Sequence, residues 1–330
     1  MIKHWAAAIA LLGLVVPAAA KEETVSVEVV RSIAQAPYYI ALGKGYFAKE
    51  GIKIDAGVVR SALDTIAPLA TGRLDVSIGA ATAGFYNAAH DGFDLRVVAS
   101  MGIQGPIMAT QPLVRKTLWD DGTIRSSKDL RGRTVVNNAP GDITEYFLTL
   151  MLRKYGMSFK DVDHSALGFA QQMVAFKNGA IDAGFLPEPL ATTAKMQGTV
   201  VLLEPEAGIA AGTVTTFVFY GKKFIDERPK VALAFLRALI RGARESQGDY
   251  NKNPELAAII AKEMELKVEA VEQCTPFAID PNLDIAKYED NMHKVEAVHR
   301  QNGRINYPQP LSFKNVVDAT LVREAAASLK

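Results

Sequence analysis

Apolar and polar residues first alternate as in strands and then recur as in helices, and this rhythm repeats along the chain. TVSVEVVR (24–31) alternates apolar with polar residues and ends in β-branched ones, so it predicts a strand. Residues 32–51 place Pro37 where a first helical turn tolerates it and Gly43 and Gly45 where a helix ends. Strands follow at 52–59, 74–79 and 94–102, with helices at 61–72 and 81–92 between them. This βαβ rhythm predicts a mainly parallel sheet with helices on both faces.

The rhythm restarts near residue 126 and predicts a second α/β unit, roughly 113–205. Ser127 or Asp129 is expected to cap a short helical turn before a strand at 133–137. In the helix that follows, Asp142 and Glu145 have the spacing of a capping box, and Gly156 is its expected stop. Further strands are expected at 162–168, 181–186 and 199–205, and further helices at 169–179 and 188–198.

One sequence pattern occurs twice, as GRLDVSIG at 72–79 and as GAIDAGFL at 179–186. Each follows an apolar helical stretch and reads as a Gly that stops the helix, an Asp, and a strand that enters the sheet. The pattern therefore marks the same position in two similar lobes. Its two aspartates, Asp75 and Asp182, are expected in turn or cap roles rather than as ligand contacts.

Residues 222–301 carry amphipathic helical patterns with no strand between them, so this tail is expected to pack on a sheet already formed. Two strand-like segments, 102–112 and 211–221, are expected to cross antiparallel between the lobes. The predicted fold class is α/β, with two lobes joined by two crossing strands and a helical tail. Lobe 1 is expected to comprise 21–107 plus 217–330, and lobe 2 to comprise 108–216.

Charge and cysteine content exclude several classes of protein. Among 330 residues, 37 are Lys or Arg and 36 are Asp or Glu, and a near-neutral chain gives no support to nucleic-acid or membrane-surface binding. The single Cys274 forms neither an internal disulfide nor a cysteine-based metal site.

The first twenty residues have a basic start, an apolar run and an Ala-x-Ala end, which predicts a secretory signal cleaved after Ala20. The alternative is a retained membrane anchor, but the apolar run is shorter than the roughly 20 residues that span a bilayer. The mature chain is thus expected in the periplasm.

Catalytic and metal-binding motifs are absent from the sequence. The five histidines fit neither a zinc motif nor a cysteine cluster, and no G-x-S-x-G or Walker loop occurs. GKGYFAKEG (43–51) resembles a dinucleotide-binding fingerprint, but it follows a helix where that motif needs a strand. No catalytic residue, metal ion or cofactor is expected.

Solutes bind to open α/β sheets beyond the carboxyl ends of the strands, so three strand-to-helix junctions are candidate contacts. The first offers Arg31, Ser32, Gln35 and Tyr38. The alternative is that Arg31 is a surface charge and Tyr38 belongs to the core.

The second junction, SIGAATAGF (77–85), offers small residues, including Ala81, and the Thr82 hydroxyl, which also suits a plain helix cap. The third, VVNNAPGDITEYF (135–147), offers Asn138, Gly141 and Asp142. Asp142 also reads as a cap, and its charge partly neutralises the positive end of the helix, which weakens the case for an anion there.

Glu188 lies between Pro187 and Pro189 after a strand, where it is suited to a cationic or hydrogen-bond-donating group. The alternative is a surface Glu in the first turn of a helix.

Segments along most of the mature chain resemble the nitrate/sulfonate/taurine-type substrate-binding proteins of ABC transporters. They are KGYFAKEGIKI (44–54), LATGRLDVSIGA (69–80), SSKDLRGRTVVNNAPG (126–141), FKNGAIDAGFLPEP (176–189) and KKFIDERPKVALAFLRAL (222–239). The resemblance implies a fold like that of type II periplasmic binding proteins, with one ligand in the inter-lobe cleft. By position, its contacts fall on Ser32–Tyr38, Ala80–Thr82, Gln104, Asn138–Ile143, Glu188 and Thr213. Family members often carry Trp where this chain has Pro187.

The resemblance further implies a monomer that closes by a hinge and delivers its ligand to a membrane permease with a cytoplasmic ATPase. Arg31 and the three helix N-termini suggest a small organic anion, a sulfonate or carboxylate, as ligand. Glu188 and Asp142 suggest instead a pyrimidine or a heterocycle like a thiamine precursor.

An enzyme that resembles pyrimidine-precursor synthases is a rival, but that group carries a cysteine-rich motif and an active-site histidine, and this chain has only Cys274, in the helical tail. A ligand-sensing regulator is a second rival, which the signal sequence argues against.

Overall fold

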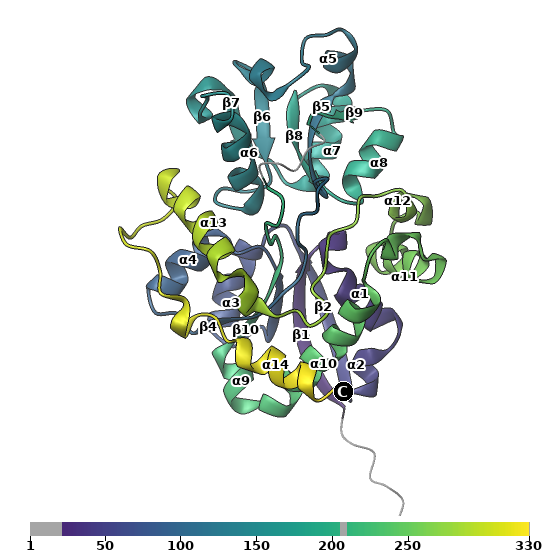
Figure 1. The fold of residues 1–330 in the computed structure, drawn as a ribbon, viewed down its shortest axis with the longest axis vertical. Coiled ribbons are helices and arrows are strands. Elements are labelled where there is room, and N and C mark those ends of the chain that lie inside the picture. Colours follow the sequence, from purple (N-terminus) through teal and green to yellow (C-terminus); the bar gives the residue numbers. More distant parts are fainter. Residues whose placement is uncertain (1–21, 205–209, 330) are drawn as a thin grey trace, which may run out of the picture.

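The computed structural model describes residues 22–204 and 210–329, so the signal segment lies outside the described residues. Two five-stranded sheets form two lobes, one above the other in Figure 1. The first sheet has the order β2-β1-β3-β10-β4, from β1 (Glu23–Val30), β2 (Ile52–Val59), β3 (Val76–Gly79), β4 (Leu95–Ser100) and β10 (Phe217–Gly221). The second has the order β7-β6-β8-β5-β9, from β5 (Thr110–Arg115), β6 (Thr134–Asn137), β7 (Asp163–Ala166), β8 (Ala183–Pro187) and β9 (Val200–Leu202).

The two sheets share one topology, which confirms two similar α/β lobes. Strand β1 is parallel to β2 and β3, as β6 is parallel to β7 and β8. Four strands of each sheet run in the same direction, as expected, and one runs opposite to them, so the sheets are mixed. In the first sheet β10 lies antiparallel between β3 and β4, and in the second β5 lies antiparallel between β8 and β9. Strands β5 and β10 each continue a crossing segment that comes from the other lobe. Each therefore enters its sheet in the direction opposite to that of the two strands beside it.

The repeated sequence pattern falls on equivalent strands, β3 and β8, and its two aspartates accept equivalent hydrogen bonds. The backbone N–H of Ser26 in β1 donates to Asp75 at 3.0 Å, and that of Thr134 in β6 donates to Asp182 at 3.1 Å. Each carboxylate thus ties its own strand to the parallel neighbour, a structural role as expected, although it is neither a turn nor a helix cap.

Helices flank both sheets (Figure 1). The first lobe has α1 (Ala36–Gly43), α2 (Tyr46–Lys49), α3 (Ile66–Ala70) and α4 (Ala83–His90), and the second has α5 (Lys116–Asp120), α6 (Ile143–Arg153), α7 (Phe169–Asn178) and α8 (Leu190–Met196). The tail has α9 (Lys222–Glu227), α10 (Pro229–Glu245), α11 (Pro254–Met264), α12 (Val268–Glu272), α13 (Glu289–Gln301) and α14 (Ala319–Ala327).

One local prediction is confirmed and another differs from the structure. Helix α1 has Pro37 in its first turn and ends at Gly43, and Gly45 takes a left-handed φ of 67° before α2. The short turn before β6 is capped by Ser126, not by Ser127 or Asp129; Asp129 completes the capping box instead.

The tail packs on the first lobe, as the amphipathic pattern predicts. Helix α10 lies so close to α1 that a Cβ on Gly242 would come within 2.0 Å of the Pro37 carbonyl oxygen. A second core cluster runs from α4 and β4 through α13 to α6, so apolar packing is continuous between the lobes on this side. Within the described ranges, no helix has the length and apolarity needed to cross a bilayer.

The two crossing segments pair antiparallel, as expected, through a few bonds rather than a full ladder. The N–H of Met101 donates to the Thr216 carbonyl and that of Gln104 to the Thr213 carbonyl, both at 2.8 Å. The crossing therefore joins the lobes through two paired but mostly irregular strands.

Candidate ligand-binding cleft

The carboxyl ends of the parallel strands of both lobes meet around a small cavity of about 50 Å³. Its lining comes from both lobes, both crossing segments and the tail: Val30, Ser32, Ala34, Gln35, Ser61, Ala62, Gly79, Ala80, Thr110, Asn138, Asp142, Ile143, Thr144, Phe169, Pro187, Thr215, Thr216 and Phe277. A cavity of this size holds only a few water molecules, so the lobes are closed in this structure.

Backbone groups bond directly across the cleft. The Ile33 N–H of the first lobe donates to the Glu188 carbonyl at 3.0 Å, and the Ala83 N–H donates to the Gly141 carbonyl at 2.7 Å. The Asn138 side chain adds a bond to the Arg60 carbonyl at 3.3 Å. These bonds are made only while the lobes are together, so they stabilise the closed arrangement.

Ser32 and Gln35 of the first junction line the cavity and cap their own short helix. The Ser32 hydroxyl accepts from the Ala34 N–H at 3.1 Å, and the Gln35 side chain accepts from the Ser32 N–H at 3.0 Å. The structure places the other two residues of this junction outside the lining. Arg31 turns to Glu265, with an ion pair of 3.2 Å, and Tyr38 is buried in the core of the first lobe.

The second junction reaches the cavity through Gly79 and through Ala80, which the resemblance placed among the contacts, but not through Ala81 or Thr82. Ala81 packs in the core, and the Thr82 hydroxyl accepts from the Phe85 N–H at 3.2 Å as the N-cap of α4. Both lie outside the lining because the chain has already turned into the helix there.

The third junction contributes three polar side chains to the lining, those of Asn138, Asp142 and Thr144, more than either of the other junctions. Asp142 is buried and caps α6: its Oδ1 accepts from the backbone N–H groups of Thr144 and Glu145 at 3.0 and 3.1 Å. Burial raises the pKa of this carboxyl, although the bonds from Thr144 and Glu145 oppose the rise. Asn138 and Ile143 also line the cavity, whereas Gly141 faces Ala83 across the cleft.

Asn138 leaves one hydrogen-bonding atom unused. Its side chain is 3% exposed, and its Oδ1 has no partner among the residues that the structure describes. Since a buried acceptor without a donor is costly, this oxygen is available to a bound molecule.

Glu188 is fully buried but does not line the cavity. In this structure it therefore takes neither the ligand-contacting position nor the surface position that the sequence suggested. Its carboxylate accepts from the Gln111 side chain at 2.8 Å, from both donors of Thr192 at 2.9 Å and from the Thr275 N–H at 3.3 Å. Burial raises its pKa, and Lys195 at 3.7 Å opposes that rise. Glu188 thus joins the second lobe to the tail.

Gln104 and Thr213 serve the crossing rather than the cavity wall. Besides the backbone bond between them, Gln104 accepts from the Ala109 N–H through its side chain at 2.7 Å. Both are buried and neither lines the cavity. The threonines that do so, Thr110, Thr215 and Thr216, lie a few residues away in the same two segments.

Sequence reasoning missed the aromatic part of the lining. Phe169 begins α7 and Phe277 comes from an irregular stretch of the tail. Phe169 follows a predicted strand at Gly168, so the junction rule that found the other three would have found it. No local pattern places Phe277 in the cleft.

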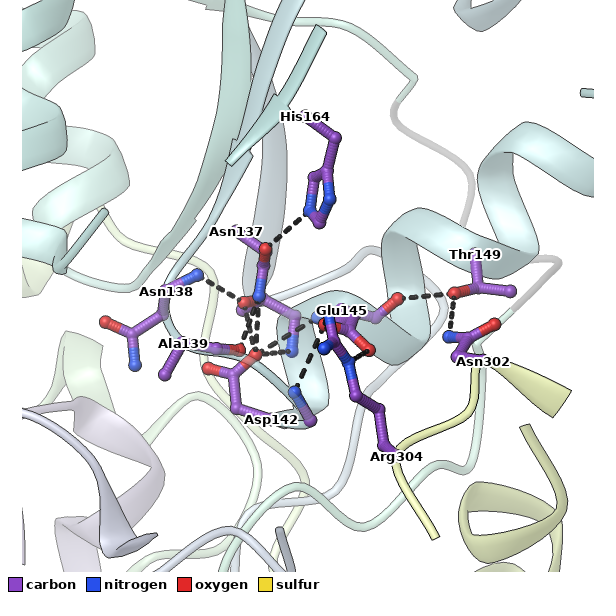
Figure 2. Close-up of polar contacts among 11 residues, drawn as sticks. Asn137, Asn138, Ala139, Asp142, Glu145, Thr149, His164, Asn302 and Arg304 are labelled. Atoms are coloured by element: carbon purple, nitrogen blue, oxygen red, sulfur yellow. Dashed lines mark hydrogen bonds and ion pairs between the residues drawn. The ribbon is translucent and has the colours of Figure 1, made fainter. Parts of the chain in front are cut away.

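Behind the cavity wall, helix α6 is fastened to the tail by a group of contacts that we call the clasp (Figure 2). Buried Glu145 forms an ion pair with Arg304, whose Nε and Nη2 donate to the carboxylate at 2.9 Å. One turn further on, the Asn302 amide donates to the Thr149 hydroxyl at 2.8 Å. The Arg304 carbonyl accepts from Asn87 of α4, so the clasp connects α6 to the first lobe.

Outside the cavity, the cleft widens into a second space, the outer groove, of about 640 Å³. The two share Val30 and Phe169, and the groove wall is mainly apolar, with charged groups at Arg31, Arg60 and Glu265. Its lining is Val30, Arg31, Val58, Val59, Arg60, Gly168, Phe169, Ala170, Gln171, Met173, Leu190, Met264, Glu265 and Leu266. The groove is therefore the mouth of the cleft between the lobes.

The chain belongs to the NMT1/THI5-like family, whose sequence model matches residues 32–252. A curated relative, the riboflavin-binding protein RibY of Chloroflexus aurantiacus, is 24% identical over 253 residues, which are 74% of this chain and 68% of that protein.

Solved structures share the fold over nearly the whole chain. The alkanesulfonate-binding protein SsuA of Xanthomonas axonopodis pv. citri, bound to MOPS, is 18% identical with a TM-score of 0.71, over 93% of this chain and 99% of its own. The periplasmic nitrate-binding protein NrtA of Synechocystis PCC 6803 is 18% identical with a TM-score of 0.77, over 93% and 89%. The expected fold, that of periplasmic binding proteins, is confirmed.

The same fold also occurs in an enzyme. The desulfurization enzyme DszB is 13% identical with a TM-score of 0.67, over 93% of this chain and all of its own. At such identities the likeness concerns the fold alone, so the chemistry of this protein is argued from its own cleft.

Proposed function

We propose that this protein is the extracytoplasmic solute-binding component of an ABC importer, which captures a small organic molecule between its lobes. The observation that carries the proposal is the buried cavity lined by both lobes and closed by backbone bonds across the cleft. A solute that binds the closed form more tightly than the open one shifts the hinge toward closure.

The proposal includes export and a membrane partner. Cleavage after Ala20 would release the mature chain from Lys21 into the periplasm, and the closed form would dock on a permease driven by a cytoplasmic ATPase. The family and the curated relative named for riboflavin binding support a role in solute capture.

Binding without catalysis suits the groups in the cavity. Among the residues described, its lining holds no His, Cys or Lys that would act as a nucleophile or base. Cys274 is buried, and burial raises the pKa of its thiol, so the reactive thiolate is disfavoured.

The test is native mass spectrometry of protein purified from the periplasm of its own host. The proposal predicts one small molecule per chain, which is lost on unfolding and raises the melting temperature when it is returned to the refolded protein. A chain that carries no molecule and is stabilised by none of the host's small-molecule extract would contradict solute capture. Conversion of the molecule during incubation would favour an enzyme.

A further inference from the structure

The charge of the side chains that line the cavity limits which class of solute can bind there. Asp142 is the one charged side chain in its lining, within the described ranges, and no Arg or Lys faces it. The hydrogen bonds that Asp142 accepts from Asn137, Thr144 and Glu145 all end on Oδ1. Its other oxygen, Oδ2, therefore remains as an acceptor toward the cavity.

Several N–H groups at the helix N-termini that would hold an anion already have protein acceptors. Protein acceptors take the N–H groups of Ile33 and Ala34 at the first junction and of Ala83 at the second. Those of Thr144 and Glu145 are taken by Asp142. An anion in the cavity would face the Asp142 carboxylate, which costs binding free energy.

Beside the hydroxyl and amide groups of its lining, the cavity offers two acceptors from the third junction. Asp142 Oδ2 and the unpartnered Asn138 Oδ1 belong to the same tight turn, and both residues are 3% exposed. Two buried acceptors in one turn are satisfied by a molecule that carries more than one N–H donor and is neutral or positively charged.

The outer groove indicates the rest of the molecule. It adjoins the cavity, since Val30 and Phe169 line both spaces, and its volume of about 640 Å³ is far larger than the cavity's 50 Å³. Val59, Met173, Leu190 and Leu266 make much of its wall apolar. A solute that fills both spaces has an apolar or aromatic body.

We propose, on the basis of the solute-binding function, that the ligand is an extended molecule with two unlike ends. Its inner end carries more than one N–H donor and no negative charge, and it bonds Asp142 and Asn138. Its outer end is apolar and lies in the outer groove. This makes Asp142 a specificity-determining residue that selects against the organic anions first expected from the sequence.

The test compares probes of matched shape and opposite charge on the ligand-free full chain. Guanidinium and nitrate form one planar pair, and benzamidine and benzenesulfonate form a pair with an aromatic body. By melting temperature and calorimetry at millimolar concentration, benzamidine is expected to bind most tightly, guanidinium weakly, and both anions not at all. Tighter binding of either anion than of its cationic match would overturn the proposal, as would no binding of any probe.

Two variants assign the binding to the two spaces. Asp142→Asn keeps the helix cap but removes the charge, and we expect it to weaken benzamidine binding about tenfold or more. Met173→Gln makes the groove polar, and we expect a loss for benzamidine several times larger than for guanidinium. Lys230→Ala, on an exposed part of α10, is the control for effects of substitution and purification that do not involve the ligand. Unchanged affinity in both variants would place the ligand elsewhere.

Failure of this inference is distinguishable from failure of the proposed function. If native mass spectrometry finds an anionic solute that the protein binds, solute capture stands and the donor-bearing ligand is excluded. If it finds none and the probes also fail, both are contradicted.

Discussion

Asp75 and Asp182 occupy the same place in the two lobes and form the same pair of interactions. Besides the neighbouring strand, Asp75 accepts from the Arg228 guanidinium at 3.1 Å and Asp182 from the Arg115 guanidinium at 2.8 Å. Each partly buried carboxylate thus satisfies a backbone N–H and an arginine at the start of a central strand. Both copies of the sequence pattern place an Asp where it accepts from one backbone N–H and one arginine, which explains why the pattern occurs in both halves.

His299 is a buried histidine whose pKa changes on folding. It is fully buried in α13, and neither ring nitrogen has a partner in the part of the chain that the structure describes. Burial lowers its pKa from 6.5 to about 4; nearby Glu145 opposes this change and Arg304 adds to it. The folded protein therefore keeps the ring neutral at pH values where the unfolded chain binds a proton.

We predict that His299 makes the protein less stable as the pH falls from 6.5 toward 4. Because its pKa is lower in the folded state, the stability is full above pH 6.5 and is lost through that window, by on the order of a few kcal/mol. In urea titrations from pH 4 to 7, His299→Leu should flatten this dependence. The control His90→Gln alters an exposed ring and should keep it. Equal pH slopes for His299→Leu and the native protein would contradict the prediction.

At the scale of elements, the clasp joins α6, whose first turn lines the cavity, to the tail. Glu145 is a buried carboxylate that Arg304 holds with bidentate geometry, and this interaction raises the pKa of Arg304. Removing one partner of a buried pair leaves a charge without compensation, which costs far more than the pair itself contributes.

We predict that Arg304→Gln and Glu145→Gln are strongly non-additive. Arg304→Gln alone should lower the free energy of unfolding by about 1–3 kcal/mol, because Glu145 stays buried and keeps only the bond from the Gly141 N–H, whereas the half-exposed Arg304 loses little hydration in the pair. The double variant should lose less than the sum of the single losses. Urea unfolding of the four proteins measures this coupling. Arg131→Gln, at an exposed ion pair with Asp161, should cost less than about 1 kcal/mol. Additive losses at 145 and 304 would show that the clasp does not couple the two elements.

Most elements were predictable from the sequence because their signals are local. Strand β2 matches its predicted range, and α6 begins after the Asp142 cap and ends before Gly156. The insertion of β5 and β10 into the middle of each sheet was not predictable, since it depends on pairing between distant segments. The same holds in the cleft: Ser32, Gln35 and Asp142 follow a junction rule, whereas Phe277 is brought there by the folded tail.

At the scale of the molecule, the cleft is closed so tightly that only a few water molecules fit in the cavity. Ile33 and Ala83 bond across it to backbone carbonyls of the second lobe. An organic solute therefore needs the lobes to move apart before it enters. The crossing segments join them through few bonds, and they are the natural place for that motion.

Small-angle X-ray scattering of the ligand-free and ligand-saturated protein tests this closure most directly. The molecule identified by mass spectrometry, at more than about 100 times its Kd, holds nearly every chain in the bound form. We expect the ligand-free protein to have a larger radius of gyration than the closed structure, and saturation to bring the scattering curve toward that of the closed form. Curves that superimpose with and without saturating ligand would contradict capture by closure of two lobes.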